Sequence, residues 1–416
     1  MNVCKKKENE KVNTIKARAL SGIRILEYAH FVSGPFCTKL MAGMGAEVIK
    51  IEEPDTGDEA RAWGPFPGDI RHQEKSGLFL SLNTNKMGIT LDPKHQKGYD
   101  IFRQLVKQAD ILVENNPPSK MEEFNLTYDT LRRINPKLIL TSLTPFGLTG
   151  PYRDYKAGDL VSFHMGGMGC VTPDWVENPD QEPPLKAGGR QADYLAGLAA
   201  AVITMGAVHG CLAERRGQHI DLSEQDAVAS VMARYLAVKS YEEGTTGRDG
   251  IPFMERPLPC KNGYVEFHCV EDYHWKALLK VMGNPDWGQE DLFQDYASRC
   301  HNWSILEPLL SKWTENRTKD EIYRAMQSEG VAFSPVNSTG DLLESEQLKA
   351  RGFFVDIDHP IAGGFRYPGA PFRFSETPWS TEKPAPLLGQ HNEEIFQKRL
   401  GMSKHEMDRL KREGII

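Results

Sequence analysis

The chain has 416 residues, more than one ordinary domain needs, so we expect two domains with an ample hydrophobic core. A formal net charge of −7 leaves no basic surface and argues against nucleic-acid binding. Seven scattered cysteines without a CxxC pair argue against a disulfide framework and a zinc site, and favour a reducing cytoplasm. Residues 1–20 are basic and polar without an apolar segment, so we interpret them as a tail and not as a signal peptide.

Strands and helices alternate along the first third of the chain. The predicted strands are Ile23–Tyr28, Glu47–Ile51, Asp110–Glu114 and Lys137–Leu143, and the predicted helices are Phe36–Met44, Gln96–Gln108 and Tyr128–Ile134. Ser33 is the expected N-cap of the first helix, with Pro35 in its first turn. Alternation of this kind implies parallel strands. The predicted fold class is therefore α/β, an open Rossmann-like sheet that binds ligands at the carboxyl ends of its strands.

Polar loops follow three of these strands. They contain His30-Phe31-Val32-Ser33, Asn115-Asn116 and Thr144-Pro145-Phe146-Gly147. Each polar side chain alone is more simply explained by hydrogen bonds within its loop. Three such loops at one sheet edge indicate a ligand cleft. Neither GxGxxG nor GxxxxGK[ST] occurs, so no fingerprint of a dinucleotide or P-loop nucleotide is present.

One carboxylate, Asp193, opens a long apolar stretch. The following residues, Tyr194–Ala213, are rich in Ala and Gly, which predicts a helix that other backbones approach closely. The simplest interpretation makes Asp193 an N-cap, and the alternative makes it a catalytic group on a rigid support. A transmembrane span is a third interpretation, which the Ala, Gly and His209 content argues against. Farther on, we expect a strand at Gly217–Leu222 and a helix from Glu224 to Tyr241 with Ser223 as its N-cap.

Composition changes after residue 241 and divides the chain. We predict a tail (1–20), a large α/β domain (21–241), a linker (242–259), a small α+β domain (260–335) and a C-terminal return to the large domain (340–416). In the small domain, the expected elements are a strand at Gly263–Cys269, helices at Trp275–Met282, Trp303–Trp313 and Lys319–Glu329, and a strand at Val331–Val336.

Several segments together resemble the class III CoA-transferases, the CaiB/BaiF family. They are SGIRILEYAHFVSGPFCTKLMAGMGAEVIKIEEPDTGD, LSLNTNKMGITLD, ADILVENN, INPKLILTSLTPFG, ADYLAGLAAA, RRGQHIDLSEQDAV and APLLGQHNEEI. The resemblance runs from about Ser21 to the C-terminus. It implies that Asp193 is the catalytic nucleophile and that the protein transfers CoA from an acyl-CoA to a free carboxylic acid. The implied intermediates are an aspartyl anhydride and an aspartyl–CoA thioester.

The same resemblance implies a set of CoA contacts. They are His30, Phe31, Val32, Ser33, Leu91, Lys94, Asn115, Asn116 and Lys156. Coenzyme A or acyl-CoA is a substrate in this family, no cofactor is tightly bound, and no metal is needed. Asp159 matches an acidic position near the nucleophile. The family also implies an interlocked homodimer without nucleic-acid or membrane partners.

Departures from the family pattern bear on substrate and reaction. Glu53 and Glu123 stand where formyl-CoA transferase has arginines, and Val32 replaces a polar residue, so we expect an acid other than oxalate or formate. The runner-up activity is acyl-CoA racemisation, which needs a His where Gly158 stands and a group that moves a proton. His164 is out of register for this role. A non-catalytic CoA-binding protein is the third possibility. The residues Phe163, Met165 and Met168 suggest an apolar-tolerant acid pocket.

Overall fold

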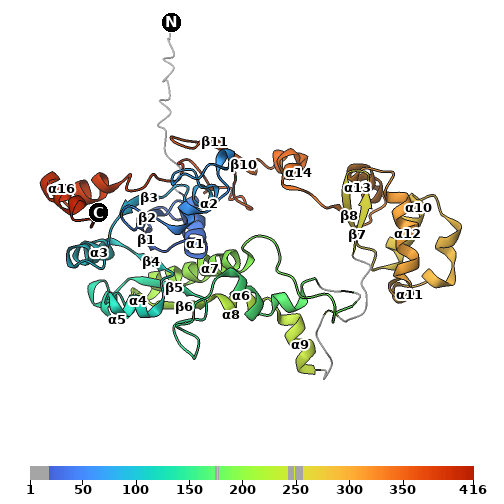
Figure 1. Ribbon diagram of the computed structural model, residues 1–416, viewed down its shortest axis with the longest axis horizontal. Helices are drawn as coiled ribbons and strands as arrows, with labels where there is room; N and C mark the ends of the chain where they lie inside the picture. Colours follow the sequence, from blue (N-terminus) through green and yellow to red (C-terminus); the bar gives the residue numbers. More distant parts are fainter. Residues whose placement is uncertain (1–17, 174–175, 177, 242–247, 249–255) are drawn as a thin grey trace, which may run out of the picture. The chain divides into compact units, whose positions relative to one another are not determined.

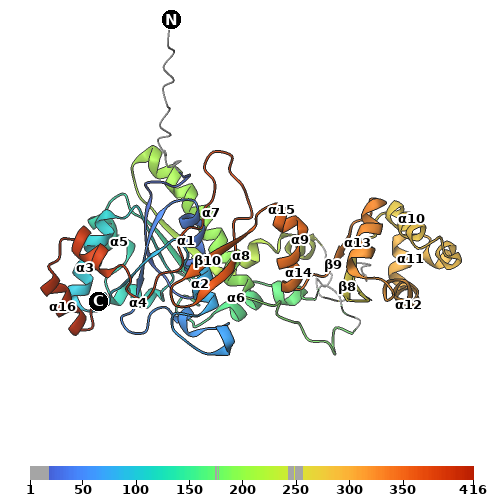
Figure 2. The same ribbon diagram turned by 90° about the horizontal axis from the view of Figure 1, so that it is seen from above.

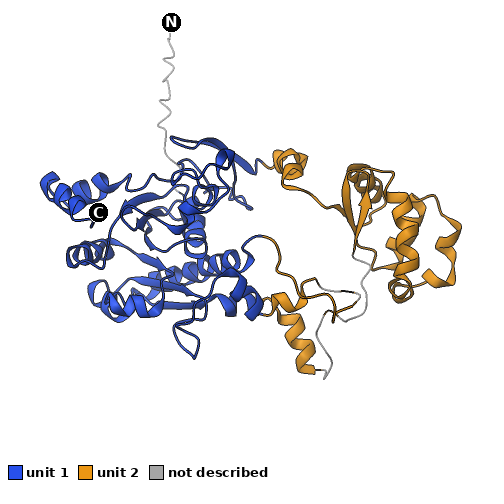
Figure 3. Cartoon of the chain, viewed as in Figure 1, with its two compact units in different colours: residues 1–166, 189–230, 352–416 blue, residues 167–188, 231–351 orange. Residues whose placement is uncertain are grey.

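The structure is a computed structural model that describes residues 18–173, 176, 178–241, 248 and 256–416. The described chain forms two compact units, coloured separately in Figure 3. Unit 1 contains the residues up to Gly166, Gly189–Ser230 and Gly352–Ile416, and unit 2 contains Gly167–Gly188 and Val231–Arg351. Most of the predicted linker and of the N-terminal tail lies outside the described residues, and the predicted domain boundaries stay a prediction.

A six-stranded parallel sheet forms the centre of unit 1 (Figure 1). Its strands are β1 (Arg24–Tyr28), β2 (Glu47–Glu52), β3 (Met87–Thr90), β4 (Ile111–Glu114), β5 (Ile139–Thr144) and β6 (His219–Ser223). Their order is β3-β2-β1-β4-β5-β6, and every neighbouring pair is parallel. The α/β prediction with a Rossmann-like parallel sheet is therefore confirmed. Strand β3 was not predicted, because its four residues, MGIT, offer too short an apolar run.

Helices cover both faces of this sheet. Helices α1 (Ser33–Gly43) and α7 (Gln191–Glu214) share a core with Ile25, Val113 and their neighbours. The opposite face packs against α3 (Gln96–Gln108), α5 (Tyr128–Ile134) and the C-terminal α16 (Lys404–Arg412). Helix α16 lies beside α3 in both views (Figure 1 and Figure 2). The alternation of apolar residues along each strand is what places one core on each face.

Helix α7 packs closely on α1 at a glycine. A Cβ atom built on Gly197 would lie 2.5 Å from the Ser33 carbonyl oxygen, so no other residue fits there without movement. The predicted close approach of backbones to this helix is confirmed. By length and composition α7 is the one helix in the described residues that could cross a membrane. Its Ala196, Ala200 and Ala207 lie in the core shared with the sheet, which is the place of a core helix in an α/β unit.

Two predicted helix features are wrong. Ser33 is the first residue of α1 and not its N-cap, which is Val32 without a side-chain cap. The predicted helix from Glu224 to Tyr241 is two helices, α8 (Glu224–Ser230) and α9 (Ala233–Tyr241). Helical periodicity continues through this sequence, so the break could not be located from apolar spacing. The Ser223 hydroxyl does accept from the Asp226 amide at 3.1 Å, as an N-cap does.

The segment APLLGQHNEEI, one of those that carry the family resemblance, binds the edge strand β3. The His391 amide donates to the Gly88 carbonyl at 2.9 Å, and the Asn392 side-chain oxygen accepts from the Thr90 amide at 2.9 Å. A π-helical turn, Glu393–Arg399, follows and buries Ile395 and Phe396 in the core of unit 1. This motif therefore covers a sheet edge that would otherwise expose unpaired backbone groups.

Unit 2 contains a three-stranded antiparallel sheet of β7 (Pro257–Cys260), β8 (Gly263–Phe267) and β9 (Phe333–Pro335) in that order. Its core is apolar and includes Trp275, Trp303 and Ile322. The remaining elements are α2 (Gly77–Leu82), α4 (Pro118–Glu123), α6 (Asp159–Met165), β10 (Phe354–His359) and β11 (Gly363–Pro368) in unit 1, and α10 (Asp272–Val281), α11 (Tyr296–His301), α12 (Trp303–Thr314), α13 (Lys319–Ser328), α14 (Thr339–Glu344) and α15 (Glu346–Ala350) in unit 2.

Candidate active site

A cavity of about 250 Å³ lies at the carboxyl ends of β1, β4 and β5 in unit 1. Seven of the predicted site residues line it together: His30, Phe31, Val32, Ser33, Asn115, Asn116 and Asp193. Lys120, Glu59, Gly158 and Glu224 line it as well. The structure thus brings the loop after β1, the loop after β4 and the start of α7 to one place. This is where an open parallel sheet is expected to bind its ligand.

Asp193 is the third residue of α7 and is only 5% exposed. One of its oxygens, Oδ2, accepts a hydrogen bond from Arg190 Nη1 at 3.0 Å. It is not the N-cap of α7, so the simplest interpretation of this residue is wrong. The cap is supplied from α6, because Asp159 Oδ1 accepts from the Ala192 amide at 2.9 Å and from the Asp193 amide at 3.3 Å. Asp159 therefore satisfies the helix start.

Carboxylates outnumber cations around Asp193. Burial, together with the charges of Glu224 and Asp159, raises the pKa of Asp193 to about 7, against the opposing effect of Arg190. Glu224 is also 5% exposed, accepts from the Ser162 hydroxyl at 3.0 Å, and has a pKa raised by burial. Desolvation and nearby like charges destabilise the ionised form of a carboxylate, whereas an ion pair stabilises it. Such a group fits a catalytic role better than a structural one.

The loop after β1 is held by buried charges. Lys50 Nζ donates to the Ala29 carbonyl at 2.9 Å, and Asp58 Oδ1 accepts from the Phe31 amide at 2.9 Å. Phe31 has φ of 67°, a left-handed backbone conformation that is uncommon for an aromatic residue. The loop leads into α1, whose first amides have no acceptor within the helix. Val32 and Ser33 line the cavity at this helix end, where anionic groups are stabilised.

Asn115 and Asn116 connect the end of β4 to the end of β1. Asn115 exchanges two hydrogen bonds of 2.8 Å with the backbone of His30. Asn116 donates to the Tyr28 carbonyl at 2.8 Å and accepts from Lys120 Nζ at 3.1 Å. Much of the hydrogen-bonding capacity of these two amides is thus used in shaping the loops. Burial lowers the pKa of His30, which favours its neutral ring.

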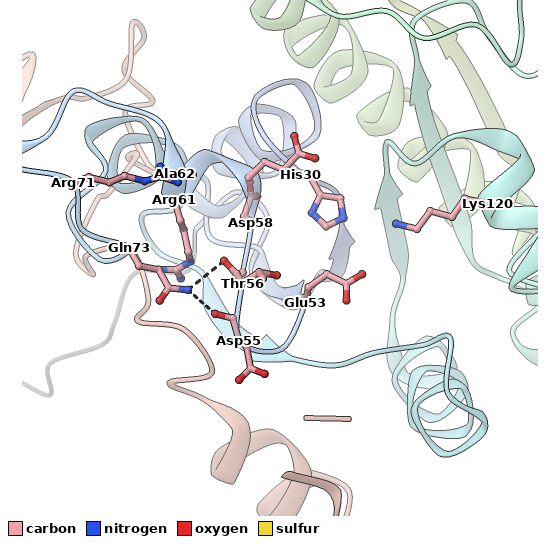
Figure 4. Close-up of a pocket in the computed structure, with 12 residues that line it drawn as sticks. His30, Glu53, Asp55, Thr56, Asp58, Arg61, Ala62, Arg71, Gln73 and Lys120 are labelled. Carbon is pink, nitrogen blue, oxygen red and sulfur yellow. Dashed lines mark hydrogen bonds between the residues drawn. The ribbon is translucent and has the colours of Figure 1, made fainter. Parts of the chain in front are cut away.

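A second cavity has a volume of about 530 Å³. It adjoins the first, because three residues line both: His30, Glu59 and Lys120. Figure 4 shows Lys120 reaching from α4 toward His30 and Glu53 on the opposite wall. The wall also contains Arg71, together with the carboxylates Asp55 and Asp58. Lys120 was not predicted as a site residue, although it lies only a few residues after the Asn115-Asn116 pair, which would have been a usable signal.

Three predicted CoA contacts do not line the cavity around Asp193. Leu91 is 1% exposed and packs in the core of unit 1. Lys94 is exposed, and its Nζ lies 2.9 Å from Glu53 Oε1, which raises the pKa of Lys94. Lys156 is exposed beside Ala157, which does line the cavity. Their roles as CoA contacts stay a prediction.

Two further predictions concern α6 and the residue before it. Gly158, which stands where a racemase would need its histidine, lines the cavity with Asp193. His164 is exposed, and Phe163 is fully buried. Neither these two residues nor Met165 lines the cavity around Asp193, so the suggested apolar acid pocket is not found there. Arg190, which contacts Asp193, and Glu224, whose charge acts on Asp193, were missed as site residues.

No group of three or more His, Cys, Asp or Glu side chains in the described ranges is arranged to hold a metal ion. A buried carboxylate in a cavity can act chemically as a nucleophile or as a general base, and Asp193 is such a group.

Comparison with known proteins identifies relatives along nearly the whole chain. A profile described as CoA-transferase family III matches residues 20–392. Formyl-CoA:oxalate CoA-transferases from Rhodopseudomonas palustris and Bradyrhizobium diazoefficiens are each 31% identical, over 96% of this chain and 97% of their own length. A CAIB/BAIF family protein from Brucella suis has a TM-score of 0.81 at 28% identity, covering 92% of this chain and 100% of that one. Rv3272 from Mycobacterium tuberculosis shares the fold, with a TM-score of 0.76 at 23% identity over 91% of this chain and 99% of that one.

Proposed function

Because the chain belongs to CoA-transferase family III, it is a CoA-transferase, and we propose that Asp193 is its covalent nucleophile. In this proposal CoA moves from an acyl-CoA donor to a free carboxylic acid. The observation that supports it is the position of Asp193, a buried carboxylate with a raised pKa in a cavity it shares with the loop His30–Ser33.

The proposed reaction has four steps, each replacing one acyl bond by another. The Asp193 carboxylate attacks the thioester carbonyl and forms an acyl–aspartyl anhydride as CoA thiolate leaves. The thiolate attacks the aspartyl carbonyl, which gives an aspartyl–CoA thioester and the free donor acid. The acceptor carboxylate attacks this thioester and regenerates an anhydride and CoA thiolate. The thiolate then attacks the acceptor's acyl carbon, which gives the new acyl-CoA and the free Asp193 carboxylate.

The arrangement around Asp193 supplies three effects for these steps. Burial strips water from a carboxylate that is a weak nucleophile in solution. The amides at the start of α1 can stabilise an oxyanion that forms beside them. Asp159 fixes the start of α7 and so fixes the position of the nucleophile. None of the steps needs ATP or a tightly bound cofactor, because one energy-rich acyl bond is exchanged for another.

We place CoA along the two adjoining cavities. The thioester end lies by Asp193 and the loop His30–Ser33, with Asn115 and Asn116 beside it. The phosphates lie toward Lys120 and Arg71, and Lys94 is paired with Glu53 of the same cavity. Ammonium and guanidinium groups are suitable partners for phosphate. Leu91 and Lys156 remain proposed contacts of the nucleotide end on resemblance alone.

Racemisation is the less favoured activity. The relatives found are CoA-transferases by name, and Gly158 places no proton-carrying side chain opposite Asp193. A non-catalytic role is disfavoured by the presence of Asp193 itself. The relatives are named for formyl-CoA and oxalate, whereas Val32 favours a different acid.

We also propose a cytoplasmic, interlocked homodimer. An apolar face of α7 supports an association surface, because Leu198, Val202 and Leu212 are 48%, 64% and 74% exposed. Apolar exposure of this kind is typical of a surface covered by another chain. Light scattering during size-exclusion chromatography tests the mass, and a monomer at micromolar concentration would contradict the proposal.

The decisive experiment for the function is a screen of free acids, oxalate and formate included, against succinyl-CoA and acetyl-CoA as donors. The expected result is formation of a new acyl-CoA, which chromatography and mass spectrometry detect. Hydroxylamine added during turnover should leave a hydroxamate on Asp193. Racemisation of an α-methylacyl-CoA without CoA exchange would contradict the proposal.

A further inference from the structure

Arg190 contacts Asp193 and is held from two other segments of unit 1. Its guanidinium carbon lies 4.0 Å from the centre of the Phe31 ring and 5.0 Å from the centre of the Trp63 ring. Its Nη1 donates to Asp193 Oδ2 at 3.0 Å. The Arg190 side chain is 26% exposed, so its three partners do not enclose it fully. Cation–π contacts with two rings add to the ion pair in holding the guanidinium.

The two rings are themselves well placed. Phe31 packs edge-on against Trp63, with ring centres 5.3 Å apart. The left-handed backbone of Phe31 is secured by Asp58, whose carboxylate is buried and paired with Lys50 at 2.6 Å. The position of Arg190 therefore depends on the loop that lines the cavity, and not only on Asp193.

The proposed reaction removes the charge that Arg190 binds. While Asp193 is an anhydride or a CoA thioester it carries no negative charge, and the guanidinium beside it loses its anionic partner. In the aspartyl–CoA thioester the donor acid has already been released, and the acceptor acid must bring its carboxylate to the aspartyl carbonyl. The carboxylate of the entering acid can then replace Asp193 as the partner of Arg190. Guanidinium and carboxylate groups form strong, directional pairs.

We propose that Arg190 binds the carboxylate of the acid substrate while Asp193 is held as the CoA thioester. This inference rests on the proposed function and deepens it. The guanidinium alternates between Asp193 in the resting enzyme and the leaving or entering acid in the intermediate. No atom or proton is transferred to Arg190. Its contribution is to bind the anion and to direct one carboxylate oxygen at the aspartyl carbonyl.

A purely structural role for Arg190 makes a different prediction. If Arg190 only holds Asp193, its loss alters the first attack and affects every second-half nucleophile equally. If Arg190 binds the acid, its loss affects carboxylate acceptors and spares neutral nucleophiles. Hydroxylamine is a small, neutral nucleophile that reacts with the same aspartyl thioester. The partition of the intermediate between acid and hydroxylamine therefore isolates the carboxylate-binding step from the formation of the intermediate.

The experiment compares the unchanged protein, Arg190→Gln, Arg190→Lys and a control, Arg132→Gln. Arg132 is an exposed residue of α5 whose side chain is 57% exposed. Each protein is supplied with acyl-CoA, with the best acid from the screen, and with hydroxylamine. Circular dichroism and thermal unfolding show whether each variant is folded.

For Arg190→Gln we expect the KM for the acid to rise by roughly 10- to 100-fold, the effect of losing one charge-assisted pair. The KM for acyl-CoA should stay within about twofold, and partition should shift toward hydroxamate by a similar 10- to 100-fold. Arg190→Lys should fall between, and Arg132→Gln should match the unchanged protein. Equal losses with acid and hydroxylamine would overturn the inference. Absence of any CoA exchange in the unchanged protein would refute the proposed function, and this inference with it.

Discussion

Two groups of buried charged residues in unit 1 differ in the ratio of carboxylates to cations. The ion-pair cluster consists of Glu27, Asp58, Lys50 and Lys86, with two carboxylates and two ammonium groups. The carboxylate cluster consists of Asp159, Asp193 and Glu224, and Arg190 is the cation that contacts it. Both groups are taken from water, but only the first is balanced within itself. The balance of charge, and not burial alone, separates them.

The pKa values follow this difference. Burial alone would raise the pKa of Asp58, but the ammonium of Lys50 overcomes that effect and lowers it to about 2. In the carboxylate cluster burial and the charges of Glu224 and Asp159 outweigh the guanidinium of Arg190, and the pKa of Asp193 rises to about 7. A fully paired carboxylate is stabilised and unreactive, whereas a carboxylate with excess negative charge nearby is ready to lose that charge by bonding to carbon. The first cluster shapes the loop Ala29–Ser33, and the second is suited to react with what the loop binds.

The largest expected effect is on the nucleophile. Asp193→Asn should lower CoA transfer by at least about 1000-fold, since the covalent route is closed, and hydroxamate labelling should disappear. Chromatographic assay of acyl-CoA products measures the loss. Retention of more than a tenth of the activity in a folded variant would remove Asp193 from the mechanism. Asp226→Asn, at an exposed residue of α8, is the matched control and should keep full activity.

The same substitution tests whether the carboxylate cluster is costly to the fold. The pKa of Asp193 is raised from 3.8 to about 7, so the folded state binds this proton more tightly than the unfolded state. Stability from this residue is therefore present at low pH and is lost as pH rises from about 4 to 7. The neutral amide that replaces the carboxylate in Asp193→Asn carries no such charge. At pH 8 the variant should gain on the order of 1–3 kcal/mol in free energy of unfolding, and at pH 4 the gain should vanish.

Breaking the ion-pair cluster should lower the free energy of unfolding, whereas Asp193→Asn should raise it. Lys50→Met leaves Glu27 and Asp58 buried with less compensation, so we expect a loss of about 3–5 kcal/mol in the free energy of unfolding. Denaturant unfolding measures it. Lys97→Met, which breaks the exposed pair with Glu413, is the control and should cost less than about 1 kcal/mol. Similar losses in the two variants would show that burial of the cluster is not decisive.

The pH dependence of the reaction probes the carboxylate cluster more finely. With the pKa of Asp193 at about 7, kcat/KM for acyl-CoA should rise with pH and level off above that value. Glu224→Gln removes one neighbouring negative charge, which favours the ionised form of Asp193. The midpoint should therefore move to lower pH by about 0.5–1 unit. An unchanged midpoint, or one that moves upward, would mean that Glu224 does not act on Asp193 through its charge.

The smallest expected effect concerns the second cavity. Glu53 binds Lys94 and places a negative charge on the wall where we propose the CoA phosphates. Glu53→Gln should lower the KM for acyl-CoA by roughly two- to fivefold, and the gain should shrink as salt is added. The control is Glu413→Gln, which breaks the exposed ion pair between Lys97 and Glu413. Neither of these two residues lines this cavity. A higher KM in Glu53→Gln would place the phosphates elsewhere.

Much of the fold was visible in the sequence because the signals are local. Apolar runs such as IRILEY and DILVE mark strands, and their alternation with helices predicts the parallel sheet. The prediction of Ser33 as a cap is wrong because side-chain type alone does not determine where the backbone becomes helical. The break after Ser230 was missed because apolar spacing continues through it.

The site was only partly visible for a different reason. Asp193 stood out because it is isolated in an apolar stretch, and Arg190 lies three residues before it, one helical turn away. Glu224 is 31 residues farther along and reaches the cavity only because β6 ends beside β5. Asp159 caps a helix that begins more than thirty residues later. Contacts of this kind arise from sheet order, which local patterns do not contain.

The glycine at position 197 has a consequence for how this enzyme can be altered. A single methyl group there would meet the Ser33 carbonyl oxygen at 2.5 Å and would push α1 away from α7. The loop that we propose binds the substrate leads into one of these helices, and the proposed nucleophile, Asp193, belongs to the other. Gly197→Ala would thus widen the gap between binding loop and nucleophile while leaving every reacting group in the chain. The absence of a Cβ atom at Gly197 therefore allows the close spacing of α1 and α7.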